Sequence, residues 1–252
     1  MKERDRAIIA DLACFRVLTR DQIASLHFAN VKNPITAANS TLLRLYRQGL
    51  IDRSANYQPY LYFPSDGSIK KDSAKVPHFL AIADAYLELC QYAKPSHFVV
   101  EPKYEKGLAE ADCFIIFKGS PLFLEIQRST YSEKVMADKI ARYEALYDSG
   151  LIQCEAWQPK VRKVFPAVLI LTQTRYAVSS SKFPIIQAAS IADFMRTMRV
   201  PEPFKEAGRC SNKNRVTKKG DRHWPSFYSS KLRIYNVKSF HHKMPTQDLS
   251  FY

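Results

Sequence analysis

The chain has 252 residues, enough for one large domain or two modest ones, and its 46% hydrophobic and 25% charged residues are typical of a folded globular protein. Its charge is less ordinary, because 38 lysine and arginine residues against 24 acidic ones give a formal net charge of +14. Such an excess favours a polyanionic partner, nucleic acid first and an anionic membrane surface second. Residues 1–63 carry nine basic and five acidic side chains, and residues 200–252 carry eleven and four, so the two ends are the expected electrostatic contacts.

Cysteine spacing and the N-terminal segment exclude further classes of protein. The five cysteines are odd in number and widely spaced, and none belongs to a CxxC or Cys/His cluster at zinc spacing. We therefore expect reduced thiols buried in the core rather than disulfides or a zinc site. The N-terminal MKERDRAIIADL lacks a long apolar segment, and no run in the sequence is long enough to span a bilayer. These features predict a cytoplasmic protein with no membrane partner.

Two helices are predicted in the first thirty residues. Apolar side chains at helical spacing give residues 3–17 one hydrophobic face. Thr19 then begins the sequence TRDQ, in which Gln22 follows three positions later. A hydroxyl and a glutamine at this spacing form a capping box, so we expect a second helix to begin here and to end near Phe28.

A third helix is predicted from Asn33-Pro34 to Gly49. Asparagine is a good N-cap, proline suits the first helical position, and glycine often follows the last turn. Short strands are expected at 50–53 and 60–63. Three helices and a hairpin in this order predict a winged helix-turn-helix domain in residues 1–66. The apolar residues of the third helix that we expect to face inward are Ile35, Ala38, Leu42, Leu45 and Tyr46.

The polar side chains of this third helix and of the hairpin suit double-stranded DNA. In such domains the recognition helix enters the major groove, where arginines reach phosphates and short polar side chains read base edges. The alternative is a winged helix that contacts only proteins and leaves its arginines solvated; the net positive charge favours DNA. The candidate DNA contacts are Thr36, Asn39, Ser40, Arg44, Arg47 and Arg53.

A second domain is predicted in residues 76–200, after a polar segment without apolar periodicity at 65–75. We expect a helix at 78–92 with Leu80, Ala83, Leu87 and Cys90 on its inner face. The further expected elements are strands at 97–101, 111–117 and 122–127, a helix at 133–147, a buried strand at 165–172, an edge strand at 176–179 and a helix at 185–198. Strands in a row followed by alternating units predict an α/β (α+β) fold with a mixed sheet flanked by helices.

Polar residues interrupt the two central strands. Asp112 lies on the first, and Glu125 and Gln127 lie on the second, two residues apart and therefore on the same face. An unpaired buried carboxylate is costly, so these residues predict either a metal site or a satisfied structural hydrogen-bond network. Glu88, on the flank of the preceding helix, is a candidate third carboxylate for Mg²⁺ or Mn²⁺.

The order helix, strand, strand with aspartate, strand with Glu-x-Lys, helix and strand resembles that of the PD-(D/E)xK nuclease superfamily. Asp112 stands at the aspartate of that motif, and Glu125-Ile126-Gln127 stands at its Glu-x-Lys. A winged helix followed by such a domain is similar to the replication-relaxation family of plasmid and mobile-element proteins. The segments that carry this similarity, within residues 10–175, are LTRDQIASLHF, TLLRLYRQGLIDR, PHFLAIADAYLEL, EADCFIIF and LEIQRSTYSEKVMADKIARYEALY.

The resemblance implies DNA binding linked to plasmid replication, DNA relaxation or transfer. A replication or transfer protein and a second copy of the chain, as a homodimer, are further candidate partners. A winged-helix transcriptional regulator is an alternative function for the same architecture.

Whether the second domain is a metal-dependent endodeoxyribonuclease is left open. A nuclease would hold a divalent ion on Asp112 and Glu125, and the ion would lower the pKa of an attacking water. Gln127 replaces the lysine that would stabilise the developing charge, although Lys139 or Arg142 on the next helix could supply a cation. That replacement favours the alternative, a degenerate nuclease fold kept as a scaffold.

In the degenerate alternative, Glu125 is expected to pair with Arg128 or Arg142, and Gln127 to close a hydrogen-bond network. Tyr143, on a helical apolar stripe, is expected to be a core residue rather than a catalytic acid.

Residues 201–252 form a basic C-terminal extension in which aromatic residues are interspersed with lysine and arginine. This composition suits nucleic acid, with charges on phosphates and rings on bases, and Lys218 and Lys219 are candidate contacts. Residues 231–237 alternate enough to predict a short strand. The alternative is an extension that packs its aromatic side chains onto the second domain.

Overall fold

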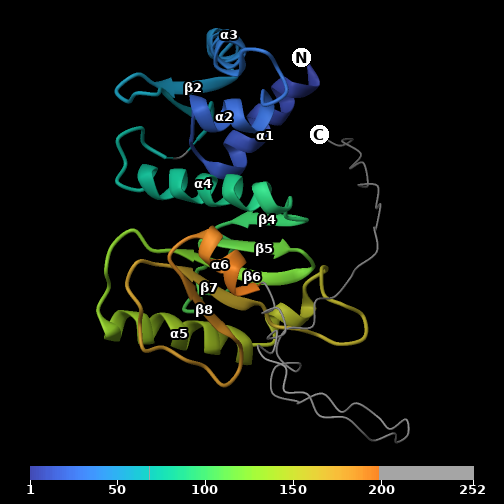
Figure 1. Cartoon of the computed structure of the whole chain (residues 1–252), viewed down its shortest axis with the longest axis vertical. Coiled ribbons are helices and arrows are strands. Elements are labelled where there is room, and N and C mark those ends of the chain that lie inside the picture. The colour runs from blue at the N-terminus through green and yellow to red at the C-terminus, as the bar shows by residue number, and fades with distance from the viewer. Residues whose placement is uncertain (68, 199–252) are drawn as a thin grey trace, which may run out of the picture.

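The computed structural model describes residues 1–67 and 69–198, and it has a mixed α/β fold (Figure 1). These residues form six α-helices, one 3₁₀ helix and two β-sheets. The predicted α/β class is therefore confirmed. The basic extension at 201–252, with Lys218, Lys219 and the strand expected at 231–237, lies outside the described residues.

Three helices and a three-stranded sheet make up the first unit. Its elements are α1 (Glu3–Phe15), β1 (Leu18–Thr19), α2 (Arg20–His27), α3 (Pro34–Arg47), β2 (Ile51–Ser54) and β3 (Leu61–Pro64). β3 lies in the middle and runs antiparallel to both β1 and β2. The sequence did not predict β1, because a strand of two residues is too short to show alternation.

The ends of α2 and α3 follow local signals of the sequence. Gln22 N donates to Thr19 Oγ1 over 3.0 Å and Thr19 N donates to Gln22 Oε1 over 2.9 Å, which confirms the capping box. Gly49 follows α3 with φ of 69°, a left-handed conformation that glycine adopts without strain. Asn33 is the N-cap residue of α3, as predicted, but its side chain makes no capping hydrogen bond, so the expected side-chain cap is absent there.

α3 buries a narrower face than its pattern predicts. Ala38, Leu42 and Leu45 are fully buried, but Ile35 and Tyr46 are 41% and 37% exposed, so the expectation that these two face inward is wrong. Figure 1 shows the reason, because α3 lies at one end of the molecule and is covered from one side only. Apolar side chains away from the covered stripe reach solvent.

α4 (Val76–Tyr92) lies between the first unit and the second sheet (Figure 1). Only Ala83 of the four residues expected on its inner face is fully buried, while Leu80, Leu87 and Cys90 are partly exposed. A helix that packs on two sides has no single apolar stripe, and this explains the wrong prediction. The buried residues of α4 are Val76, Phe79, Ile82, Ala83, Ala85 and Leu89.

The core is continuous from the first unit to the second sheet. Phe15 of α1 packs against Tyr86 of α4 and against Phe98 of the second sheet, with ring centroids 5.4 and 5.6 Å apart. Tyr86 and Phe98 are themselves 4.7 Å apart. The buried residues of the first unit, of α4 and of one face of the second sheet form one hydrophobic cluster. A second cluster, which includes Phe123 and Tyr143, lies between the other face of that sheet and α5.

A buried polar side chain also joins the first unit to α4. Gln22 of α2 is 6% exposed, and its Nε2 donates to the backbone oxygen of Leu80 over 3.0 Å and to Oδ1 of Asp84 over 2.6 Å. Both acceptors belong to α4. The same glutamine therefore caps α2 and fixes α2 against α4.

The second sheet has the strand order β4-β5-β6-β7-β8. Its strands are β4 (His97–Val100), β5 (Cys113–Phe117), β6 (Ser120–Ile126), β7 (Ala167–Leu171) and β8 (Ile185–Ala188). β4, β5 and β6 are antiparallel neighbours, whereas β6, β7 and β8 are parallel. α5 (Glu133–Asp148) connects β6 to β7 on the face opposite α4, and the 3₁₀ helix η1 (Leu151–Cys154) follows it.

Two predictions near residue 185 are wrong. Residues 176–179 form no strand, and residues 185–188, expected to begin the last helix, form the edge strand β8. The β-branched pair Ile185-Ile186 aligns with Val168 and Leu169 of β7, so sheet pairing outweighs the helical pattern. α6 (Ile191–Met198) begins after Ser190, whose Oγ accepts a hydrogen bond from Asp193 N at 3.1 Å and so caps the helix.

In the part of the chain that the structure describes, Cys14, Cys90, Cys113 and Cys154 are free thiols. Cys154 is exposed rather than buried. Cys210 lies outside the described residues. No helix among residues 1–67 and 69–198 is long and apolar enough to cross a membrane.

Candidate functional site

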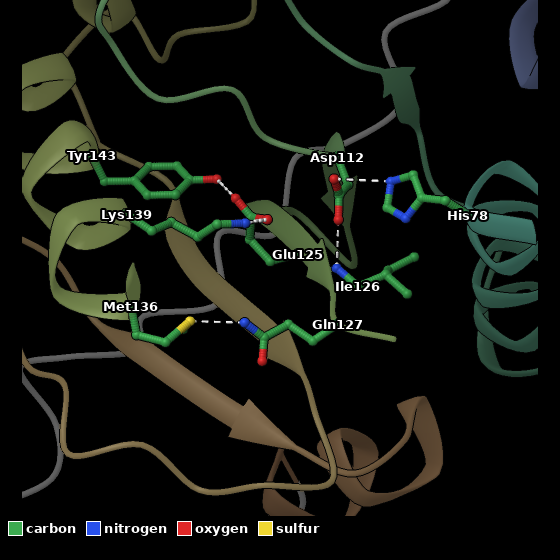
Figure 2. A network of polar contacts seen from close by, with 8 residues as sticks. All are labelled: His78, Asp112, Glu125, Ile126, Gln127, Met136, Lys139 and Tyr143. Atoms are coloured by element: carbon green, nitrogen blue, oxygen red, sulfur yellow. Dashed lines mark hydrogen bonds and ion pairs between the residues drawn. The ribbon is translucent and has the colours of Figure 1, made fainter. Parts of the chain in front are cut away.

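Two carboxylates meet at one end of the β5–β6 pair (Figure 2). Cys113 pairs with Leu124 in the antiparallel register, so the next residues outward, Asp112 and Glu125, lie opposite each other on one face. Gln127 lies two residues further along, on the same side of the chain. Three side chains that are separated by up to fifteen positions in the sequence thus lie together.

Glu125 is only 1% exposed, and both of its carboxylate oxygens are bonded. The Tyr143 hydroxyl donates to Oε1, and the Lys139 ammonium group forms an ion pair with Oε2. Both partners come from α5, where residues four apart share a face. Burial and the nearby Asp112 charge raise the pKa of Glu125 from 4.5 to about 7, against the opposing effects of Lys139 and Tyr143.

The two α5 side chains keep their protons at neutral pH. Burial by itself lowers the pKa of Lys139, but the Glu125 and Asp112 carboxylates outweigh it, and the net pKa is raised. Burial, and then the Glu125 charge, raise the pKa of Tyr143 well above its ordinary value. Lys139 is therefore a cation here and Tyr143 a neutral donor, as befits a buried core tyrosine.

Asp112 is held by the backbone of β6 and by a side chain of α4. Ile126 N donates to its Oδ2 over 2.6 Å, and Nε2 of His78, in the first turn of α4, lies 3.1 Å from its Oδ1. The hydrogen bond to Asp112 raises the pKa of His78, although burial opposes it. The sequence did not single out His78, because its position depends on how α4 crosses the end of β5.

Gln127 does not take over the role of a lysine. Its Nε2 lies 2.8 Å from Sδ of Met136, and its Oε1 is buried without a hydrogen-bond partner among the described residues. The expected closed hydrogen-bond network is therefore incomplete at this side chain. The cation of the cluster is Lys139, one of the two candidates on the following helix.

The arginines expected near Glu125 lie elsewhere. Arg128 and Arg142 are both exposed, and neither forms an ion pair with Glu125. The alternative in which Glu125 pairs with one of them is therefore wrong. The rotation of α5 about its axis decides this, because Lys139 lies toward the sheet and pairs with Glu125 (Figure 2), whereas Arg142 is exposed.

Glu88 does not join the cluster. It is exposed, and it follows His78 by ten residues, which is about 15 Å along the axis of α4. No group of three histidine, cysteine or acidic residues suited to a metal ion occurs in residues 1–67 and 69–198. The predicted third carboxylate is thus not brought to Asp112 and Glu125.

The cluster fits a resident Mg²⁺ or Mn²⁺ poorly. Such an ion needs several oxygen ligands in near-octahedral geometry. Gln127 Oε1 is one oxygen without a partner, but each oxygen of Asp112 and Glu125 already accepts a bond. An ion between the carboxylates would have to displace the Lys139 ammonium group from Glu125.

A second candidate site lies on α3 and the β2–β3 hairpin. Arg53 of β2 places its guanidinium group over the rings of Tyr46 and Tyr60, at 4.5 and 5.3 Å from their centroids. Stacking of this kind orients a guanidinium group and leaves its N–H donors free for an anion. The predicted contacts that are exposed on α3 are Thr36, Asn39, Ser40, Arg44 and Arg47.

Arg44 differs from the other predicted DNA contacts. Its Nη2 lies 2.7 Å from Oδ1 of Asp5, a carboxylate of α1 that is 2% exposed. The hydrogen bond from Arg44 lowers the pKa of Asp5. Arg44 therefore holds α3 against α1, whatever else it contacts.

A groove of about 430 Å³ separates α3 from the hairpin. Its lining combines guanidinium groups, side-chain amides and aromatic rings. The sequence could not reveal this mixture, because α2, α3, β2, β3 and the loop before β3 all contribute to it. The lining residues are Arg20, Asn39, Leu43, Arg53, Gln58, Pro59, Tyr60 and Tyr62.

Comparison of the chain with protein-family models, with curated proteins and with solved structures gave no match. The resemblance to the replication-relaxation family therefore stays a prediction that rests on the sequence motifs.

Proposed function

We propose that this protein binds double-stranded DNA through a winged helix made of α1–α3 and the β2–β3 hairpin, in the replication, relaxation or transfer of a plasmid or mobile element. The observation that carries this proposal is the state of the arginines on that surface. Arg47 and Arg53 have no carboxylate within ion-pair distance in the described chain, and exposed Asn39 lines the same groove as Arg53. Unpaired cations next to base-reading side chains are what a DNA contact requires.

The net charge of +14 supports the same proposal. Cations that neutralise DNA phosphates release condensed counterions, and this release supplies much of the affinity at low salt. The membrane alternative has less support, because the exposed face of α3 carries polar side chains such as Thr36, Asn39 and Ser40 rather than a continuous apolar face.

We further propose that the second unit, made of α4, the five-stranded sheet, α5 and α6, is a PD-(D/E)xK-like scaffold without nuclease activity. The support is the closed state of its carboxylates, in which Lys139, Tyr143, His78 and a backbone N–H together bond every oxygen of Asp112 and Glu125. Incubation of supercoiled plasmid with the protein and Mg²⁺ or Mn²⁺ should leave the plasmid intact. Nicking that disappears in both Asp112→Ala and Glu125→Ala would overturn this part of the proposal.

DNA binding is tested by fluorescence anisotropy of the whole chain with a labelled 20-base-pair duplex between about 50 and 200 mM salt. We expect binding at low salt that weakens as salt rises. Arg47→Ala and Arg53→Ala should each lower the slope of log affinity against log salt by about 1, as for the loss of one phosphate contact. Arg162→Ala, at an exposed arginine of the second unit, is the matched control and should not change it. Absence of binding at 50 mM salt would overturn the proposal.

A further inference from the structure

The groove between α3 and the hairpin contains exposed aromatic and apolar side chains. Binding of a phosphate alone would need only cations and hydrogen-bond donors. Leu43 of α3 and Tyr60, just before β3, both line the groove and remain 37% and 38% exposed. Aromatic rings stack on the faces of bases, and these faces are hidden in an intact duplex. An aromatic wall at a DNA-facing surface therefore suits a base that has left the stack.

The same groove carries cations that suit a phosphate. Arg53 is oriented by the ring of Tyr60 and has no carboxylate partner within residues 1–67 and 69–198. Arg20, at the start of α2, pairs through Nε with Asp21 at 2.7 Å, which engages one of its five N–H donors. Charge and aromatic surface thus occur within one groove of about 430 Å³, a volume in the range of small-ligand sites.

Side-chain amides complete the lining. Asn39 projects into the groove from α3, and Gln58 does so from the hairpin. Each amide offers donors and an acceptor, the groups that pair with the edge of a base. The lining therefore matches the three parts of a nucleotide: face, edge and phosphate.

We propose that this groove receives one unstacked nucleotide of the bound DNA, with its base against Tyr60 and Leu43 and its phosphate on Arg53. The inference rests on the proposed DNA binding, which it extends from an intact duplex to DNA with an unpaired base. The cost of unstacking is least where the base is already unpaired, so such DNA is the preferred ligand.

The test is anisotropy of the whole chain with three labelled DNAs of one sequence: a fully paired duplex, the duplex with one unpaired central nucleotide, and the same DNA with an abasic unit at that position. The abasic unit preserves the backbone distortion but removes the base. We expect the DNA with the unpaired base to bind about tenfold more tightly than the other two, the effect typical of stacking one base on an aromatic ring.

Two tyrosines of the hairpin region form a matched pair of variants. Tyr60 lines the groove and Tyr57 does not, although both are 38% exposed. Tyr60→Ala should abolish the preference for the unpaired base, while Tyr57→Ala and Tyr60→Phe should retain it. Circular dichroism and thermal melting check that Tyr60→Ala is folded.

The outcomes separate this inference from the proposed function. Equal binding of all three DNAs would overturn the inference and leave duplex binding intact, and so would equal preference for the abasic and base-containing DNAs. A third outcome is that the protein retains dAMP in equilibrium dialysis but binds the three DNAs equally. This result would assign the groove to a free nucleotide and would also overturn the inference. Absence of binding to every DNA at about 50 mM salt would remove both proposals.

Discussion

The two candidate sites differ in whether their charged side chains are paired. At the end of β5 and β6, Glu125 is buried and each of its oxygens meets a donor from α5. On α3 and β2, Arg47 and Arg53 have no acidic partner among the described residues. A satisfied buried pair keeps neighbouring elements in place but has little left to offer a ligand, whereas unpaired surface cations attract polyanions. The polar residues that stand out most in the sequence are thus the ones least available for binding.

The largest expected effect comes from breaking the buried pair. Lys139→Met leaves Glu125 buried without its cation, and loss of one partner of a buried ion pair costs about 3–5 kcal/mol of unfolding free energy. Urea denaturation measures the loss. Lys134→Met, at an exposed lysine of the same helix, is the control and should change stability by less than about 0.5 kcal/mol.

A second substitution distinguishes a buried charge from lost packing. In a Glu125→Leu background, Lys139→Met should cost much less, because no buried carboxylate is left unpaired. An equal cost in both backgrounds would mean that the aliphatic part of Lys139, rather than its charge, stabilises the protein.

The next effect is on the pH dependence of stability. Since the pKa of Glu125 rises from 4.5 to about 7 on folding, the folded state binds more protons than the unfolded state between these values. Stability therefore falls as pH rises from about 5 to 7, by at most about 3 kcal/mol from this group. Urea denaturation of the wild type and of Glu125→Gln across this pH interval measures the effect. The fall in unfolding free energy that comes from Glu125 should be present in the wild type and absent in Glu125→Gln.

His78 contributes with the same sign, so the comparison with Glu125→Gln is needed to isolate the glutamate. The raised pKa of His78 stabilises the protein below pH 6.5, and this contribution is lost as pH rises through the folded pKa. His78→Gln should retain the part of the fall in unfolding free energy with rising pH that comes from Glu125. Parallel curves of unfolding free energy against pH for the wild type and Glu125→Gln would contradict a raised pKa of Glu125.

A smaller effect separates two arginines of α3. Arg44→Ala leaves the buried Asp5 carboxylate without its main donor and should cost about 1–3 kcal/mol of unfolding free energy. Arg47→Ala should leave stability unchanged within about 0.5 kcal/mol and weaken only DNA binding. Denaturation and anisotropy on the same samples measure both. Equal losses of stability would show that Arg47 is also a structural residue.

The smallest effect is expected at Glu88, whose exposed side chain lies far from Asp112 along α4. Glu88→Gln should change the melting temperature by less than about 2 °C, roughly the scale of a neutral surface substitution. Addition of about 5 mM MgCl₂ should not raise the melting temperature of the wild type or of Glu88→Gln. Stabilisation by Mg²⁺ that is lost in Glu88→Gln would show that this carboxylate does reach a metal site.

Short-range features of the fold could be predicted from the sequence, and features set by packing between distant elements could not. The capping box of Thr19 and Gln22 and the glycine that ends α3 depend on a few neighbouring residues, and both occur as expected. The inner face of α4 differs from the predicted one, because burial of Leu80 depends on elements packing from two sides. Ile185 lies in a strand rather than in the predicted helix, because that strand exists only through pairing with β7.

The same division applies to the candidate site. Asp112 and Glu125 were recognisable as carboxylates on apolar strands, and the antiparallel register brings them opposite each other. The choice between Lys139 and Arg142 required the rotation of α5 about its axis, which the sequence does not contain. His78 required the crossing of α4 over the end of β5, a contact between residues 34 positions apart.

The position of α4 limits how the first unit could be transplanted. Gln22 bonds to the backbone of Leu80, and Phe15 packs against Tyr86, so the inner surface of the first unit is completed by a helix that follows it in the chain. A fragment that ends at residue 66 would leave this apolar surface bare. A fragment meant to keep the first unit folded by itself would have to extend through Tyr92 and carry polar replacements on the side of α4 that faces the second sheet.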